Sequence, residues 1–175
     1  MEIERKFTVA KLPDDLDSYE VHRIEQAYLN VRPAIRVRQQ DDVYYMTYKG
    51  IRKEDSEGIG QTEYNMELDA TAYEHLCKKA DGNIITKKRY IIPLNEDGFD
   101  AEYLTAHGSV AEALKSGNIK IELDVFEGVF AGRILAEVEF PDEDSAAAYN
   151  PASWFKEDVT GDPAWSNAHM SAEKV

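Results

Sequence analysis

The chain has a single cysteine and no long apolar segment. Because Cys77 has no second cysteine to pair with, the 175 residues contain no internal disulfide, which is typical of a reducing compartment. No run is long and apolar enough to span a membrane, and the charge that begins at Glu2 leads us to expect no signal peptide. These absences predict a soluble cytoplasmic protein. We expect Cys77 to pack in a core and not to act as a nucleophile.

Positive charge is also scarce. The chain has 20 Lys and Arg against 34 Asp and Glu, which gives a net charge of -14. Nonspecific binding to nucleic acid or to an anionic membrane needs an excess of basic residues, so we expect neither as a partner. The acidic balance still allows a small anionic substrate in a locally basic pocket.

Two common kinds of site are missing from the sequence. The four histidines, which show no metal-ligand spacing and are expected to be structural or exposed, are His22, His75, His107 and His169. No Walker-type glycine-rich loop is present, which excludes a P-loop phosphate site. Any metal or phosphate chemistry must therefore use carboxylates, lysines and arginines.

Apolar and polar residues alternate at period two through much of the chain, which predicts strands. With 43% apolar residues, the chain can form one domain with a sizeable core. The predicted strands are residues 1–8, 21–29, 34–39, 43–49, 61–68, 83–92, 118–126 and 133–140.

Other segments lack this alternation. Asp69 is a candidate N-cap for a helix that continues to Ala80, and residues 109–116 predict a short helix within the weakly periodic segment 95–117. The charged, glycine-containing residues 50–60 predict a mobile loop. The acidic tail after Phe140 is helix-prone.

Charge of both signs collects on one face of the predicted strands, whereas the other face is apolar. The charged positions are Glu2, Glu4, Glu63, Glu67, Glu122, Asp124, Glu137 and Glu139 with Lys6, Arg36, Arg38, Lys49, Lys87, Arg89 and Lys120. An ordinary solvated sheet face is one explanation, but such a face usually also contains many Thr, Ser and Gln. If the sheet curls into a barrel, these charges line a hydrated cavity.

Buried charges need partners, because an unpaired buried charge costs several kcal/mol. A polyanion together with a divalent cation would supply these partners: the cationic side chains match phosphate oxygens, and the carboxylates suit Mg²⁺ or Mn²⁺. The face therefore predicts a site for a metal and a phosphorylated small molecule.

The order and spacing of several motifs resemble those of the CYTH-domain family, the triphosphate tunnel metalloenzymes. These motifs are Glu2-x-Glu4-x-Lys6-Phe7, Arg36-x-Arg38, Thr47-Tyr48-Lys49, Glu63 to Glu67, Lys87-x-Arg89-Tyr90, Glu122 to Phe126, Glu137 to Phe140, residues 158–162 and Ser166-Asn167. The resemblance implies a mainly β (α+β) fold, a closed antiparallel β-barrel tunnel of about eight strands with peripheral helices. It implies one domain over 1–175, with the tunnel in 1–140 and a C-terminal helical segment in 141–175.

The resemblance also assigns roles to residues. The implied metal ligands are Glu2, Glu4, Glu139, Glu137 and Asp124, of which the last two could instead position water. The implied phosphate ligands are Lys6, Arg36, Arg38, Lys49, Lys87 and Arg89. Glu137, Asp124 and Arg38 are the implied catalytic residues, and Glu63, Glu67, Glu122 and Lys120 are further tunnel positions. Asn65 stands where relatives often have a third carboxylate.

The expected activity is Mg²⁺- or Mn²⁺-dependent hydrolysis of a triphosphate, with inorganic tripolyphosphate as the first candidate. The opening sequence Glu-Ile-Glu-Arg-Lys-Phe most resembles the small bacterial tripolyphosphatases. The alternatives are a class IV adenylate cyclase acting on ATP, a nucleoside or thiamine triphosphatase, and a non-catalytic triphosphate or polyphosphate sensor, for which Asn65 is the reason. The sequence allows a monomer or a homodimer.

Overall fold

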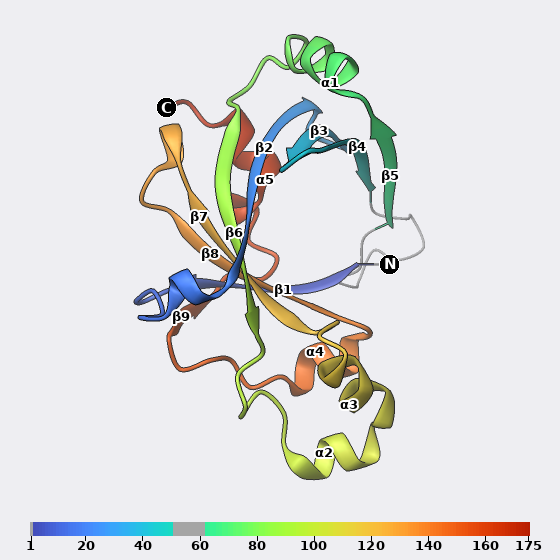
Figure 1. Cartoon of the computed structure of the whole chain (residues 1–175), viewed down its shortest axis with the longest axis vertical. Coiled ribbons are helices and arrows are strands. Elements are labelled where there is room, and N and C mark those ends of the chain that lie inside the picture. Colours follow the sequence, from blue (N-terminus) through green and yellow to red (C-terminus); the bar gives the residue numbers. More distant parts are fainter. Residues whose placement is uncertain (1, 51–61) are drawn as a thin grey trace.

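The protein, analysed as a computed structural model that describes residues 2–50 and 62–175, is built on one large antiparallel sheet (Figure 1). Its strands are β1 (Ile3–Val9), β2 (Glu20–Asn30), β3 (Ala34–Gln40), β4 (Val43–Gly50), β5 (Thr62–Leu68), β6 (Ile85–Pro93), β7 (Lys120–Phe126), β8 (Ile134–Phe140) and β9 (Phe155–Asp158). Their order in the sheet is β5-β4-β3-β2-β6-β7-β8-β1-β9.

Short helices surround this sheet. They are α1 (Ala70–Cys77), α2 (Ala101–Ala106), α3 (Gly108–Lys115), α4 (Glu143–Ala148) and α5 (Asn167–Ala172), with 3₁₀ turns η1 (Leu16–Ser18), η2 (Gly128–Phe130) and η3 (Pro163–Trp165). Within the part of the chain that the structure describes, no helix is long and apolar enough to cross a membrane.

The sheet curls strongly but is not closed by backbone hydrogen bonds in the described residues. Its edge strands β5 and β9 have no backbone pairing with each other, so the predicted closed barrel is not shown. The N-terminal end of β1 nevertheless approaches β4 and β5 (Figure 1). There the Glu2 carboxylate lies 2.6 Å from Nζ of Lys49, so an ion pair joins β1 to β4.

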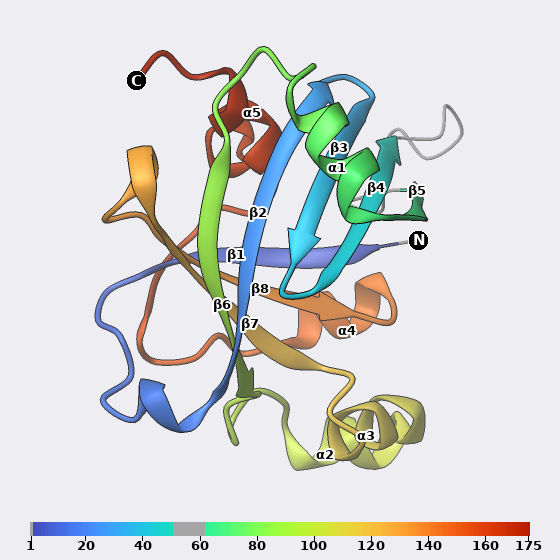
Figure 2. The same cartoon turned by 45° about the horizontal axis from the view of Figure 1, so that its top comes forward.

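The outer face of the sheet is apolar and is covered by helices in two places. On β1, β7 and β8, residues such as Phe7, Leu123 and Val138 pack with Val110 of α3 and Ala146 of α4. On β2 to β5, a second cluster packs under α1, on the opposite side of the molecule (Figure 2). Burial of these apolar faces leaves the charged alternate positions on the inner face.

A third apolar cluster lies on the inner face, at one end of the curl. Tyr28, Ile85, Phe126 and Leu135 come from four different strands and pack with Met170 of α5. The C-terminal helix α5 therefore occupies one end of the space inside the curled sheet. This apolar end lies apart from the charged positions.

Most predicted elements are confirmed. The predicted strands correspond to β1 to β8, and the Asp69 side chain caps α1 by accepting a hydrogen bond from the Ala72 amide at 2.7 Å. Cys77 packs in the α1 cluster as expected, although α1 ends there and not at Ala80. Residues 109–116 form α3, offset by one residue. Except for Gly50, the predicted mobile loop lies outside the described residues.

Two elements were not predicted. Helix α2 lies in the weakly periodic segment, and β9 extends the sheet beyond β1 within a tail that was expected to be helical. Each is short, and β9 has only four residues, of which three are exposed, so neither produces a recognisable hydrophobic period.

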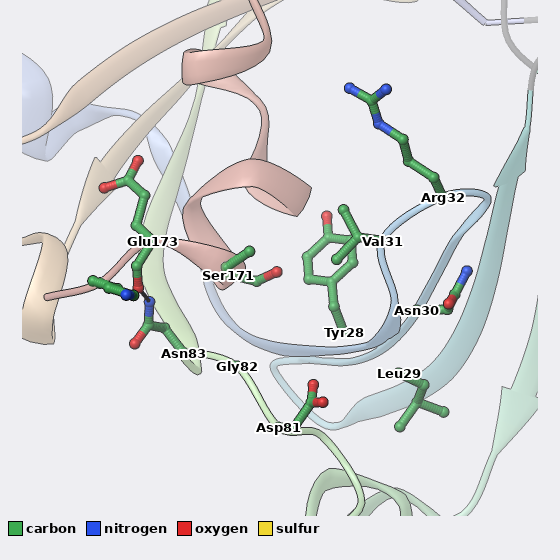
Figure 3. Close-up of a pocket in the computed structure, with 12 residues that line it drawn as sticks. Tyr28, Leu29, Asn30, Val31, Arg32, Asp81, Gly82, Asn83, Ser171 and Glu173 are labelled. Atoms are coloured by element: carbon green, nitrogen blue, oxygen red, sulfur yellow. Dashed lines mark hydrogen bonds between the residues drawn. The ribbon is translucent and has the colours of Figure 1, made fainter.

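Hydrogen bonds from distant parts of the chain anchor α5. The Asn83 amide group donates to the carbonyls of Met170 and Glu173 at 3.1 and 2.7 Å, and its backbone N–H donates to Ser171 at 2.7 Å. Arg133 binds the Glu173 carboxylate with two nitrogens at 2.9 and 2.6 Å. These contacts border a hollow of about 660 Å³ beside α5 (Figure 3).

Gly82 allows this close approach, because a Cβ at this position would clash with the Ser171 carbonyl oxygen. We predict that Gly82→Ala lowers the free energy of unfolding by about 1–3 kcal/mol by displacing α5. Urea denaturation measures this change. Gly108→Ala is the matched control, since a Cβ there has no neighbour within 4 Å. Equal stabilities for the two variants would contradict a tight α5 contact.

Candidate functional site

A polar cavity of about 240 Å³ lies inside the curl of the sheet. Every side chain that lines it in the described part of the chain is charged or an amide. The lining residues are Glu2, Glu4, Lys6, Arg36, Arg38, Gln40, Lys49, Glu63, Arg89, Glu122, Glu137, Glu139 and Asn167. Such a lining suits a highly charged ligand and offers no apolar surface.

The strand register brings these charges together. Because alternate residues point inward, the antiparallel pairing sets Glu4 beside Glu139, and Lys6 and Glu122 on either side of Glu137. Charges that are distant in sequence thus become neighbours on the inner wall.

A buried ion cluster forms the floor of the site. Lys87 and Asp124 are 1% and 0% exposed and contact each other. Arg89 donates to Asp124 at 2.7 and 2.8 Å and to Glu137 at 2.6 Å, and also contacts Glu122. Lys6 lies 3.0 Å from Glu4 and 3.2 Å from Glu137. The cluster satisfies charges that would otherwise be costly to bury.

These contacts fix the protonation states. Burial alone would raise the pKa of Asp124, but Arg89 and Lys87 hold it below its ordinary value. Burial is likewise overcome at Glu137, where Lys6 and Arg89 hold the pKa well below the ordinary value. Burial lowers the pKa of Lys87 to about 8, against the attraction of Asp124. Asp124 and Glu137 are therefore carboxylates at neutral pH.

A second group of carboxylates lines the same cavity and is called the acidic wall here: Glu2, Glu4, Glu63 and Glu139. Lys49 contacts Glu2 at 2.6 Å and Glu63 at 3.0 Å. Burial raises the pKa of Glu2 to about 7 despite Lys49, and burial and the nearby Glu122 and Glu4 raise the pKa of Glu139. Burial is the main cause of both raised pKa values, and the neighbouring carboxylates add to it, whereas burial is overcome at Glu63, where Lys49 and Asn65 lower the pKa to about 2.

Arg36 and Arg38 differ from the other cations of the site. Both are 6% exposed, and among residues 2–50 and 62–175 neither has a carboxylate within 4.0 Å. Arg38 is held by neutral groups: its Nε donates to Gln26 Oε1 at 2.8 Å and its Nη1 to Tyr45 Oη at 3.2 Å. Two guanidinium groups that lack an acidic partner are suited to binding an anion.

The structure brings most predicted site residues to the cavity, but not all of them. Lys87 and Asp124 lie beneath its wall, in the buried cluster. Glu67 and Lys120 do not line the cavity. Glu67 is exposed on the edge strand β5, four residues from the lining Glu63, and Lys120 lies at the first position of β7, two residues from the lining Glu122.

Three polar residues of the site were not predicted. Gln40 continues the alternation of Arg36 and Arg38 along β3, so this period could have predicted that it lines the cavity. Gln26 is fully buried under Arg38, and Asn167 comes from α5. Asn65 does not line the cavity; it accepts a hydrogen bond from Thr47 Oγ1 at 2.6 Å and donates to Glu63 at 2.9 Å. In the folded chain Asn65 thus positions Glu63.

The predicted ligand set is not gathered at one point. In the described residues, no three His, Cys, Asp or Glu side chains converge on a common metal position. Glu2 and Glu4 pair with lysines of the cavity, whereas Asp124 belongs to the buried cluster with Lys87 and Arg89.

The CYTH domain matches residues 1–156. The chain belongs to the CYTH family. This finding confirms the resemblance of its charged strand motifs to that family.

Two curated relatives are each named inorganic triphosphatase. The one from Nitrosomonas europaea is 34% identical, with 97% of this chain and 96% of the relative covered. The one from Acetivibrio thermocellus is 29% identical, with 97% of this chain and 92% of the relative covered.

Solved structures share the fold. A crystal structure described as an inorganic triphosphatase superposes with a TM-score of 0.65 at 33% identity and covers 99% of this chain and 96% of that one. A putative adenylyl cyclase from Hippeastrum, described as having a dominant triphosphatase activity, gives 0.53 at 17% identity, with 84% and 83% covered. At that identity the likeness concerns the fold alone.

The buried cluster gives a test of stability. Asp124→Asn removes the carboxylate shared by Lys87 and Arg89 and leaves their charges short of a partner. We predict a loss of about 3–5 kcal/mol in the free energy of unfolding, measured with urea at pH 7. Asp14→Asn, which breaks only an exposed pair with Lys11, should cost less than about 1 kcal/mol. Similar losses in both variants would refute a structural role for the cluster.

Proposed function

We propose that this CYTH protein is a divalent-metal-dependent triphosphatase that hydrolyses inorganic tripolyphosphate. The observation that carries the proposal is the polarity of the cavity: Arg36 and Arg38 lack acidic partners among the described residues, and an acidic wall faces the same space. Anionic phosphates fit the two guanidinium groups, and a divalent cation fits the carboxylates.

The lining favours inorganic phosphate over a nucleotide. No aromatic or aliphatic side chain of the described residues lines the cavity, whereas a nucleobase needs such surface for burial or stacking. The cavity of about 240 Å³ is also below the usual range for drug-sized ligands, which begins at about 300 Å³. The curated relatives named inorganic triphosphatase support the same choice.

The acidic wall suits Mg²⁺ or Mn²⁺. Its donors are carboxylate oxygens, which these ions prefer, and a bound cation would compensate the burial that raises the pKa values of Glu2 and Glu139. We propose Glu2, Glu4 and Glu139 as ligands, with Glu137 at the border of the wall. Bound metal would neutralise charge on the phosphate oxygens.

The other residues position the substrate. Arg36 and Arg38 bind the phosphate chain, and Arg38 stabilises charge on the phosphoryl group during transfer. Lys6, Lys49 and Arg89 also line the cavity. They contact phosphate once their carboxylate partners also bind the metal ion. Asp124 acts from below by holding Lys87 and Arg89 in place.

Glu137 is the proposed water-positioning residue. It lines the cavity, and its lowered pKa keeps it ionised, so it can accept a hydrogen bond from a water molecule. The water oxygen attacks the terminal phosphorus in line as the anhydride P–O bond breaks, which yields orthophosphate and pyrophosphate. We propose that residues 1–140 supply this site and residues 141–175 complete it, within one domain.

The activity can be tested directly. With Mg²⁺ or Mn²⁺, we predict release of orthophosphate and pyrophosphate from tripolyphosphate, and much slower turnover of ATP. Glu2→Gln and Glu4→Gln should each lower kcat/KM by about 100-fold or more, because each removes a charged ligand. Phosphate release assays and product chromatography provide the measurement.

The exposed Glu102→Gln on α2 is the matched control and should keep wild-type activity. Formation of cyclic AMP with pyrophosphate from ATP would favour a cyclase, and tripolyphosphate binding without turnover would favour a sensor. Either result would overturn the proposed hydrolase.

Metal binding should depend on pH through Glu2. Metal requires the ionised carboxylate, and the Glu2 pKa is raised to about 7, so affinity increases as pH rises through that value. We predict that Mn²⁺ binds about tenfold more tightly at pH 8 than at pH 6, measured by titration calorimetry. Glu2→Gln should bind Mn²⁺ weakly and lose most of this dependence. An unchanged pH dependence in Glu2→Gln would remove Glu2 from the ligand set.

A further inference from the structure

Asn167, the first residue of α5, lines the charged cavity although it lies far from the strands in sequence. Asn167 is only 8% exposed. Its Oδ1 atom has no hydrogen-bond partner among the described residues. A buried amide without a partner costs free energy, so its retention at this place needs an explanation.

The same region contains other unpartnered polar atoms. Four buried side-chain atoms of the described residues lack a partner, and three of them are Gln26 Nε2, Arg36 Nε and Asn167 Oδ1. Arg36 and Asn167 line the cavity, and Gln26 holds Arg38, which lines it too. Unsatisfied donors and an amide therefore collect around the two arginines proposed to bind phosphate.

The fold holds Asn167 in a defined position. The preceding Ser166 caps α5 by accepting a hydrogen bond from the His169 amide at 3.1 Å. One turn later, Met170 is buried in the apolar cluster of the inner face, and Asn83 binds the last turn. The helix is thus fixed at its beginning, middle and end, which keeps the backbone of Asn167 beside the cavity.

We propose that Asn167 is a substrate-positioning residue that binds oxygens of the phosphate chain held by Arg36 and Arg38. An amide offers both a donor and an acceptor without adding charge, so it can bind a phosphate oxygen and still accept from a guanidinium. Because α5 and its apolar cluster occupy the space beyond Asn167, a terminal phosphate without a substituent fits at this end. This inference rests on the proposed triphosphatase function.

Two substitutions of Asn167 test the proposal. Asn167→Ala removes the hydrogen bonds and should raise KM for tripolyphosphate about tenfold. Asn167→Asp keeps the shape but adds a negative charge beside the phosphates, and should raise KM about 100-fold. Neither variant should lower the melting temperature to the extent predicted for Gly82→Ala, since Asn167 Oδ1 has no hydrogen-bond partner to lose among the described residues.

His169→Ala is the matched control, because His169 is exposed on the same helix and does not line the cavity. It should leave KM and the melting temperature unchanged. If Asn167→Asp kept wild-type KM, or if KM rose only in proportion to a loss of stability, the proposal would be overturned.

The design separates this inference from the proposed function. If the wild-type protein does not hydrolyse tripolyphosphate, the proposed function fails, and calorimetry with tripolyphosphate still tests Asn167. Binding to the wild-type protein at least about tenfold tighter than to Asn167→Asp supports the inference. Equal affinities, or no binding by the wild-type protein, overturn it.

Discussion

The site depends on the pairing of opposite charges across neighbouring strands. Lys87 and Asp124 are fully buried on two paired strands, Arg89 lies beside them at the cavity, and each charge is acceptable there because of the others. Arg89 also connects this cluster to Glu137 of β8. Replacement by apolar residues could stabilise the floor, but it would remove the charge that the cavity uses.

The arrangement divides the cations of the site into two groups. Lys6, Lys49, Lys87 and Arg89 each contact carboxylates, whereas Arg36 and Arg38 contact neutral groups or none among the described residues. A polyanion can bind the second group without first displacing a carboxylate. The division therefore leaves two guanidinium groups available to an anion before any ligand enters.

The sequence predicts the strands and the charged face, because period-two alternation determines both. It also predicts α1, whose cap at Asp69 is a local signal. It does not reveal which charges pair, since Glu67 and Glu63 share one alternation and differ only in distance along β5 from the cavity. Asn167 was missed as a site residue for a related reason: its position depends on Asn83, Gly82 and Arg133, which lie far away in the chain.

The ion pair between Glu2 and Lys49 joins β1 to β4, which share no backbone hydrogen bond in the part of the chain that the structure describes, and it links the two proposed ligands thermodynamically. A cation that binds Glu2 and Glu4 competes with Lys49 and Lys6, and the released ammonium groups become available to phosphate. Each ligand then prepares the site for the other, and by reciprocity the coupling free energy is the same in either order of binding. The ion pairs that join the sheet across the cavity would thus exchange their partners when metal and phosphate bind.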